Sequence, residues 1–133
     1  MSGLCLLSGA LGAFLPAGSF TLAWLHSIEQ VRWEEDWRIV AAGPAYVLQL
    51  DAARVHGSAA GMEPPPGARL RDGVWHYTAD DLRVDTLDLA HSPYTAGYEL
   101  CIDGHCRALS EYLTGIGSGP ATIRLRGCEG PGD

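Results

Sequence analysis

The sequence Phe20-Thr-Leu-Ala-Trp-Leu-His26 is followed, after a short link, by Val31-Arg-Trp-Glu-Glu-Asp-Trp-Arg-Ile39. Both runs alternate between two faces with a period of two residues, which is typical of β-strands and not of helices. If the link turns the chain into a hairpin, Trp24 lies opposite Trp33. Aromatic cross-strand pairs of this kind stabilise a sheet by about 0.2–1 kcal/mol each, so the two runs predict an antiparallel pair in a consistent register.

Short runs of the same kind follow along the chain, separated by turns rich in glycine and proline. Asp72-Gly73 and Asp103-Gly104 are typical two-residue hairpin turns, because both turn positions need a positive φ. About ten short antiparallel strands predict one all-β domain over residues 1–133, folded as a compact β-sandwich or barrel. The expected strands span 20–26, 31–39, 45–50, 53–56, 68–71, 74–77, 82–89, 95–102, 105–109 and 121–127. Only 110–113 is expected to be helical, as a single turn capped by Ser110.

Composition and charge exclude several classes of protein. With 47% hydrophobic and 19% charged residues the chain is not disordered. The formal net charge is −7 and the arginines are scattered, whereas a nucleic-acid-binding protein needs a basic stripe. The N-terminus lacks the basic region of a signal peptide, and glycines and Pro16-Ala17-Gly18 interrupt it too early for a membrane span. The sequence predicts an exported mature domain whose signal peptide has been removed.

The cysteines indicate an oxidising compartment. A hairpin turn within Cys101-Ile-Asp-Gly-His-Cys106 places Cys101 opposite Cys106, with Cα atoms about 4.5 Å apart, at the short end of the range for a disulfide. The alternative is a metal site formed by Cys101, His105 and Cys106, but structural zinc sites usually show two close pairs of ligands. Cys5 and Cys128 would then form a second bridge that joins the first strand to the last. Disulfides persist outside the cytosol, so the periplasm or another exported location is expected.

Glu35 is the one charged residue on an otherwise apolar strand face. An ionised carboxylate there is costly unless it is paired or hydrogen-bonded, and otherwise it is protonated. His26, Ser27 and Glu29 could gather with Glu35 at one end of the hairpin. One interpretation is a polar plug that fixes the turn, and the other is a site for a small molecule or a cation. No known catalytic motif is present, and no cofactor is expected.

Several of these stretches resemble a known bacterial family. Phe20-Thr-Leu-Ala-Trp-Leu-His-Ser-Ile-Glu29, Trp33-Glu-Glu-Asp-Trp37 and Gly57-Ser-Ala-Ala-Gly-Met-Glu-Pro64 are similar to DUF1850, a domain of unknown function. The resemblance implies a small exported protein encoded beside TRAP-type transporters, especially those that use a TAXI substrate-binding protein. It also implies that one binding site is formed by His26, Ser27, Glu29, Glu35, Ser58 and Met62.

The sequence therefore predicts a non-enzymatic periplasmic accessory or binding module associated with TRAP-type solute uptake. The expected partners are a TRAP-type transporter or its substrate-binding protein, together with a small-molecule ligand. The alternative is a small hydrolase or metal-dependent enzyme that uses His26, Glu29 and Glu35.

Overall fold

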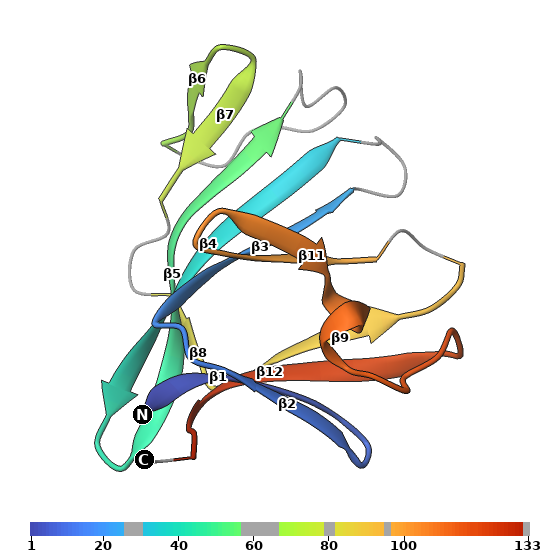
Figure 1. The fold of residues 1–133 in the computed structure, drawn as a ribbon. Helices are drawn as coiled ribbons and strands as arrows, with labels where there is room; N and C mark the ends of the chain where they lie inside the picture. The colour runs from blue at the N-terminus through green and yellow to red at the C-terminus, as the bar shows by residue number, and fades with distance from the viewer. Residues whose placement is uncertain (26–30, 57–66, 79–81, 95–96, 132–133) are drawn as a thin grey trace.

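Twelve antiparallel strands in two sheets make up the protein, as seen in a computed structural model that describes residues 1–25, 31–56, 67–78, 82–94 and 97–131. These residues contain no α-helix, and their only helical segment is the short 3₁₀ helix η1 (Leu109–Tyr112). The sheets lie against each other as in a sandwich and do not close into a barrel (Figure 1). The all-β prediction is confirmed, and of its two architectures the sandwich is the correct one.

The smaller sheet has four strands in the order β2-β1-β12-β9. Its strands are β1 (Ser2–Ser8), β2 (Leu11–Leu15), β9 (Leu87–His91) and β12 (Ala121–Glu129). The first strand and the last strand of the chain are direct neighbours in this sheet. The two ends of the described chain therefore lie close together (Figure 1).

The larger sheet has eight strands, with β8 paired to β5 beside the main order β11-β10-β3-β4-β5-β7-β6. Its central strands are β3 (Ser19–Leu25), β4 (Arg32–Ala42) and β5 (Ala45–His56). The others are β6 (Arg69–Arg71), β7 (Val74–Tyr77), β8 (Arg83–Val84), β10 (Glu99–Ile102) and β11 (His105–Ala108).

The predicted hairpin of β3 and β4 is confirmed in its register. Trp24 lies opposite Trp33, and Phe20 lies opposite Trp37. The two aspartate–glycine turns are confirmed as well, since all four of their residues have positive φ, including Asp72 at 51° and Asp103 at 52°. Short-range turn chemistry therefore fixed both the hairpins and the side chains that face each other across them.

Three details differ from the sequence prediction. The expected strands 45–50 and 53–56 are one continuous strand, β5. They look separate in the sequence because a bulge at Asp51, opposite Asp36 and Trp37, breaks the period of two. The expected strand 82–89 is split between β8 and β9, which belong to different sheets. The helical turn is capped at Ala108 without a side-chain hydrogen bond, so Ser110 is not its cap.

The core lies between the two sheets and is built mainly from leucines. The smaller sheet contributes Leu4, Leu6, Leu89, Ile123 and Leu125; the larger contributes Phe20, Leu22, Trp37, Leu48, Leu50 and Leu100; and the segment around η1 adds Leu109 and Leu113. Trp37 is therefore a core residue. Trp24 is half-buried and packs against the core, and Trp33 and Trp75 are also half-buried.

The two sheets approach each other closely at Gly127 of β12. A Cβ atom there would lie 2.7 Å from Tyr46 Cβ and 2.9 Å from Ile39 Cγ2, so only glycine fits. Trp33 lies six residues before Ile39 on β4, a distance of about 20 Å along an extended strand. In Figure 1 the ends of β4 and β5 that carry Trp33 and Val55 rise beyond the smaller sheet, together with the β6–β7 hairpin.

Both predicted disulfides are present. Cys101 and Cys106 join β10 to β11 with Cα atoms 4.0 Å apart, and Cys5 and Cys128 join β1 to β12 with Cα atoms 6.0 Å apart. Two disulfides indicate an extracytoplasmic protein. Among the described residues no helix is long and apolar enough to cross a membrane.

Candidate functional site

Of the six predicted site residues, the structure describes only Glu35. His26, Ser27, Glu29, Ser58 and Met62 lie outside the described residues. Their gathering around Glu35 stays a prediction, and so does the hydrolase that would use His26 and Glu29. The candidate site is therefore built here from Glu35 and its described neighbours.

Glu35 belongs to a row of residues that crosses the larger sheet on its inner face. Cross-strand pairing aligns Leu100, Leu22, Glu35, Ala53 and Tyr77 on five neighbouring strands. Directly opposed residues in antiparallel strands project to the same side of a sheet. Because Leu22, Ala53 and Leu100 are buried in the core, Glu35 faces inward, as the alternation predicted.

A second row, two residues further along the strands, is largely aromatic. Trp24 pairs with Trp33, Trp33 with Val55, and Val55 with Trp75. Tyr98 precedes β10 and packs against Trp24. Together with Tyr77 of the first row, these side chains form the aromatic face: Trp24, Trp33, Trp75, Tyr77 and Tyr98.

Trp24 contacts two other rings of the aromatic face, and the side chains of this face are partly open to solvent. The rings of Trp24 and Trp33 are stacked with centroids 6.2 Å apart, and Trp24 and Tyr98 are tilted with centroids 5.7 Å apart. All five side chains are half-buried. Large aromatic side chains that remain partly exposed at the end of a sandwich are typical of a binding surface.

The Glu35 carboxylate is held in a weakly polar environment. Among the described residues its hydrogen-bond donor is Trp37 Nε1, 3.3 Å from Oε1, and no arginine or histidine pairs with it. Burial raises the pKa of Glu35, and the hydrogen bond from Trp37 opposes that rise only in part. The protonated form is therefore favoured relative to an exposed glutamate.

Two tyrosines of the aromatic face lie within the electrostatic reach of Glu35. Burial and the negative charge of Glu35 both raise the pKa of Tyr77, and the same two causes raise the pKa of Tyr98. The two tyrosines lie on opposite sides of Glu35 along the sheet, since β7 lies beyond β5 and Tyr98 lies beyond β3 in the sheet order. Glu35 therefore lies between them, next to the aromatic rings.

Replacing Glu35 with Gln should leave the free energy of unfolding within about 1 kcal/mol of wild type, or raise it. The physical reason is that the raised pKa makes the ionised form unfavourable in the folded state. The folded protein holds the proton more tightly than the unfolded chain, so wild-type stability falls as pH rises above 4.5, the ordinary value. Urea unfolding at pH 4 and pH 8 should show the advantage of the variant growing with pH. A large loss of stability at pH 8 would show instead that the charged carboxylate stabilises the fold.

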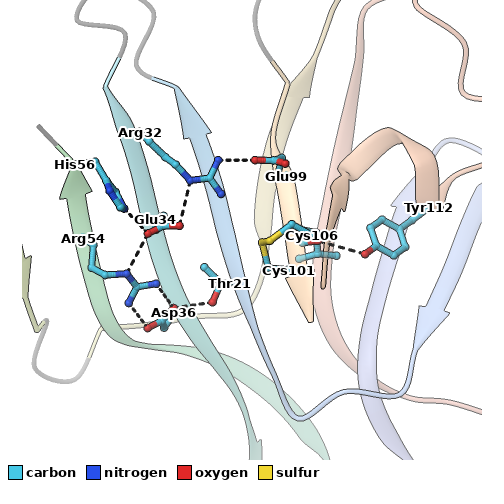
Figure 2. Close-up of a disulfide and its surroundings, with 11 residues drawn as sticks. Thr21, Arg32, Glu34, Asp36, Arg54, His56, Glu99, Cys101, Cys106 and Tyr112 are labelled. Carbon is cyan, nitrogen blue, oxygen red and sulfur yellow. Dashed lines mark hydrogen bonds and ion pairs between the residues drawn. A yellow bond between two sulfur atoms is a disulfide. The ribbon is translucent and has the colours of Figure 1, made fainter. Parts of the chain in front are cut away.

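The opposite face of the same strands carries a network of ion pairs (Figure 2). Arg54 binds Asp36 through two hydrogen bonds of 2.6 and 2.8 Å and Glu34 through a third of 3.2 Å. Arg32 bridges Glu34, at 3.1 Å, and Glu99, at 2.5 Å. This network satisfies its charges internally and lies beside the Cys101–Cys106 disulfide, so we assign it to the stability of the sheet.

Glu34 is the most connected member of this network. Although burial alone would raise its pKa, hydrogen bonds from His56, Arg32 and Arg54 outweigh burial and lower the pKa to about 2. Replacing Glu34 with Gln should lower the free energy of unfolding at pH 7 by about 1–3 kcal/mol. The lowered pKa stabilises the wild type above pH 4.5, and that stabilisation is lost as pH falls towards 2.

Urea unfolding of the wild type and the Glu34→Gln variant, measured from pH 7 to pH 2, tests this. The difference between them should shrink below pH 4.5. The matched control is Glu111→Gln, because Glu111 is an exposed carboxylate paired only with Arg107 among the described residues and should contribute little. An equal effect of both substitutions at pH 7 would contradict the account.

Sequence reasoning identified Glu35 as a site residue and paired Trp24 with Trp33, but it assigned none of the five aromatic residues to the site. The position of Trp75 and Tyr77 after the Asp72-Gly73 turn could have indicated that both side chains share one face, because they occupy alternate positions on one strand. The pairing of β7 with β5 could not be deduced from that turn. Within the described part of the chain, no group of three or more His, Cys, Asp or Glu side chains is placed to hold a metal ion.

Comparison with known proteins gives one match. The family model described as Domain of unknown function (DUF1850) matches residues 20–109. The matched range contains Glu35, the whole aromatic face and the Cys101–Cys106 disulfide, whereas β1, β2 and β12 lie outside it. No curated protein matches the chain, and no solved structure matches it.

Proposed function

Because the chain belongs to the DUF1850 family, whose function is unknown, we propose a function from its own residues: a non-enzymatic periplasmic binding module. In this proposal the aromatic face holds a small molecule beside Glu35. The module assists solute uptake by a TRAP-type transporter, either directly or through the substrate-binding protein of that transporter.

The observation that carries the proposal is the position of Glu35 among partly exposed aromatic side chains. Ligand sites are typically apolar and aromatic, with a small number of polar groups that orient the ligand. Here Trp24 and Trp33 offer ring surface. Glu35 offers a carboxylate that, among the described residues, accepts a single long hydrogen bond from Trp37. A structural role would be better served by an uncharged side chain at this position.

The setting of the site supports binding as well. Its residues lie on, or directly beside, paired strands of one sheet, and sites on rigid strands are held more precisely than sites on loops. On the opposite face, ion pairs tie β4 to β5 and to β10, and a hydrogen bond from Thr21 to Asp36 ties β3 to β4. The aromatic face is therefore preorganised, which reduces the entropy lost on binding.

Two features support the location and the partner. Two disulfides favour an extracytoplasmic protein, and the periplasm is the compartment through which TRAP-type uptake passes. The resemblance of Phe20–Glu29 and Trp33–Trp37 to a family encoded beside TRAP-type transporters supports the association with uptake.

Titrations monitored by tryptophan fluorescence test the binding function. Choline, benzoate and glucose represent an organic cation, an organic anion and a neutral sugar. At least one of them should change the emission of the wild type with a saturable curve. Tyr77→Ala should weaken that response at least tenfold. Tyr94→Ala should not, because Tyr94 is 87% exposed and lies outside the aromatic face. The absence of a saturable response to all three probes would refute the binding function.

A further inference from the structure

Glu35 has unused hydrogen-bonding and charge capacity. A carboxylate offers about four acceptor positions, and within the described residues one of them is used, by the indole N–H of Trp37 at 3.3 Å. The carboxylate is half-buried, so water can satisfy the rest only in part. A ligand that brings positive charge or N–H donors would complete this environment.

Among the residues that the structure describes, no cationic side chain is in position to do so. Arg32 and Arg54 lie on the strands that carry and flank Glu35, but they project to the opposite face, where Glu34, Asp36 and Glu99 bind them (Figure 2). Because successive side chains of a strand point to opposite faces, these arginine side chains lie on the other side of the sheet from Glu35.

The remaining cationic side chains nearby are also placed elsewhere. His76 pairs across the strands with Arg54 and Arg69, so both His76 and Arg69 share the outer face. Arg107 lies opposite Leu100 at the edge of the sheet, but it binds Glu111 and covers the ring of Tyr112 at 4.6 Å. Within the described residues, the inner face near Glu35 therefore carries one carboxyl group and no cationic side chain to pair with it.

The surroundings of Glu35 also favour a cation. The face of an aromatic ring attracts a cation within about 6 Å of its centroid, most strongly for tryptophan. Trp24 and Trp33 lie in the row next to Glu35, and Tyr77 and Tyr98 lie on either side of it along the sheet. The chain as a whole carries a formal net charge of −7, which also attracts cations and repels anions.

We propose that the ligand of the aromatic face is a small organic cation, an amine or quaternary ammonium compound. Its charged nitrogen lies against Glu35, and its alkyl groups lie against Trp24 and Trp33. This inference rests on the proposed function and specifies the chemical class of the solute. The carboxylate selects for a positively charged ligand, and the aromatic rings favour apolar substituents around that charge. Together they select for a ligand that has both properties.

Isothermal titration calorimetry with choline and its neutral carbon isostere, in which carbon replaces the nitrogen, tests the inference on the wild-type protein. Choline should bind at least tenfold more tightly than the isostere. Glu35→Gln should reduce the affinity for choline at least tenfold, while Asp85→Asn should leave it unchanged. Asp85 is a suitable control because it is exposed and lies beside β12 near Tyr46 and Glu129, away from the aromatic face.

The outcomes separate the inference from the proposed function. If benzoate or the neutral isostere binds as tightly as choline, the organic cation is the wrong ligand class, although the protein remains a binding module. If Glu35→Gln and Asp85→Asn weaken choline binding equally, choline is attracted by net charge alone and the inference is overturned. If choline, its isostere and benzoate all fail to bind, the inference falls, and the proposed function falls with it if glucose also fails.

Discussion

Removing the Cys5–Cys128 disulfide is expected to lower the free energy of unfolding by about 5 kcal/mol, the largest effect predicted for this protein. The bridge closes a loop with a sequence separation of 123 residues, so its loss greatly increases the conformational entropy of the unfolded chain. The Cys101–Cys106 bridge closes a separation of only 5 residues and should contribute about 2 kcal/mol by the same loop-entropy relation.

The comparison requires two double variants, Cys5→Ala/Cys128→Ala and Cys101→Ala/Cys106→Ala, unfolded in urea under identical conditions. The first should unfold at a much lower urea concentration than the second. Equal losses would contradict the account, and they would show that residual structure already restricts the ends of the unfolded chain.

Replacing Trp37 with Ala should lower the free energy of unfolding by about 3–5 kcal/mol. Trp37 is 3% exposed and lies in the core, so its removal leaves a large cavity. The same side chain donates the hydrogen bond that Glu35 accepts. The substitution therefore also removes the indole N–H that counteracts the effect of burial on the pKa of Glu35.

The matched control is Trp37→Phe, which keeps most of the apolar volume but loses the indole N–H. It should cost about 1–2 kcal/mol, and it should raise the pKa of Glu35 further, because the hydrogen bond from Trp37 lowers that pKa. Urea unfolding and a carboxyl titration followed by nuclear magnetic resonance measure the two effects. An unchanged pKa of Glu35 in Trp37→Phe would contradict the assigned hydrogen bond.

Local chemistry made much of the fold predictable. The alternation on β3 and β4 gave the register that pairs Trp24 with Trp33. The aspartate–glycine turn at 103–104 gave the pairing of Cys101 with Cys106. In each case the residues that determine the structure are neighbours in the chain, so the sequence pattern and the geometry coincide.

The pairing of strands that are far apart in the chain could not be predicted from the sequence. The order of strands in the larger sheet places β10 beside β3 and β7 beside β5, and no turn motif encodes either contact. Tyr77 and Tyr98 join the candidate site only through these contacts. The bulge at Asp51 was missed for a related reason, since it is defined by the pairing with the partner strand. Leu50 and Ala53 both face inward although two residues, and not one, lie between them.

The outer-face network shows the same limit. The alternation of side chains along β4 puts Arg32, Glu34 and Asp36 on one face. Their ion pairs, however, depend on Arg54 from β5 and Glu99 from β10. Charged residues on one strand indicate an exposed face, and only the neighbouring strands decide which charges are paired.

The most direct test of the central claim is the nuclear magnetic resonance spectrum of the four tryptophan indole N–H groups during titration with choline, benzoate and glucose. If the aromatic face is the ligand site, at least one probe shifts the signals of Trp24 and Trp33 along a single saturation curve. The signal of Trp37 should shift with them, because its N–H is bonded to Glu35. A probe that binds the protein while leaving Trp24 and Trp33 unchanged, or no response to any of the three, would contradict the claim.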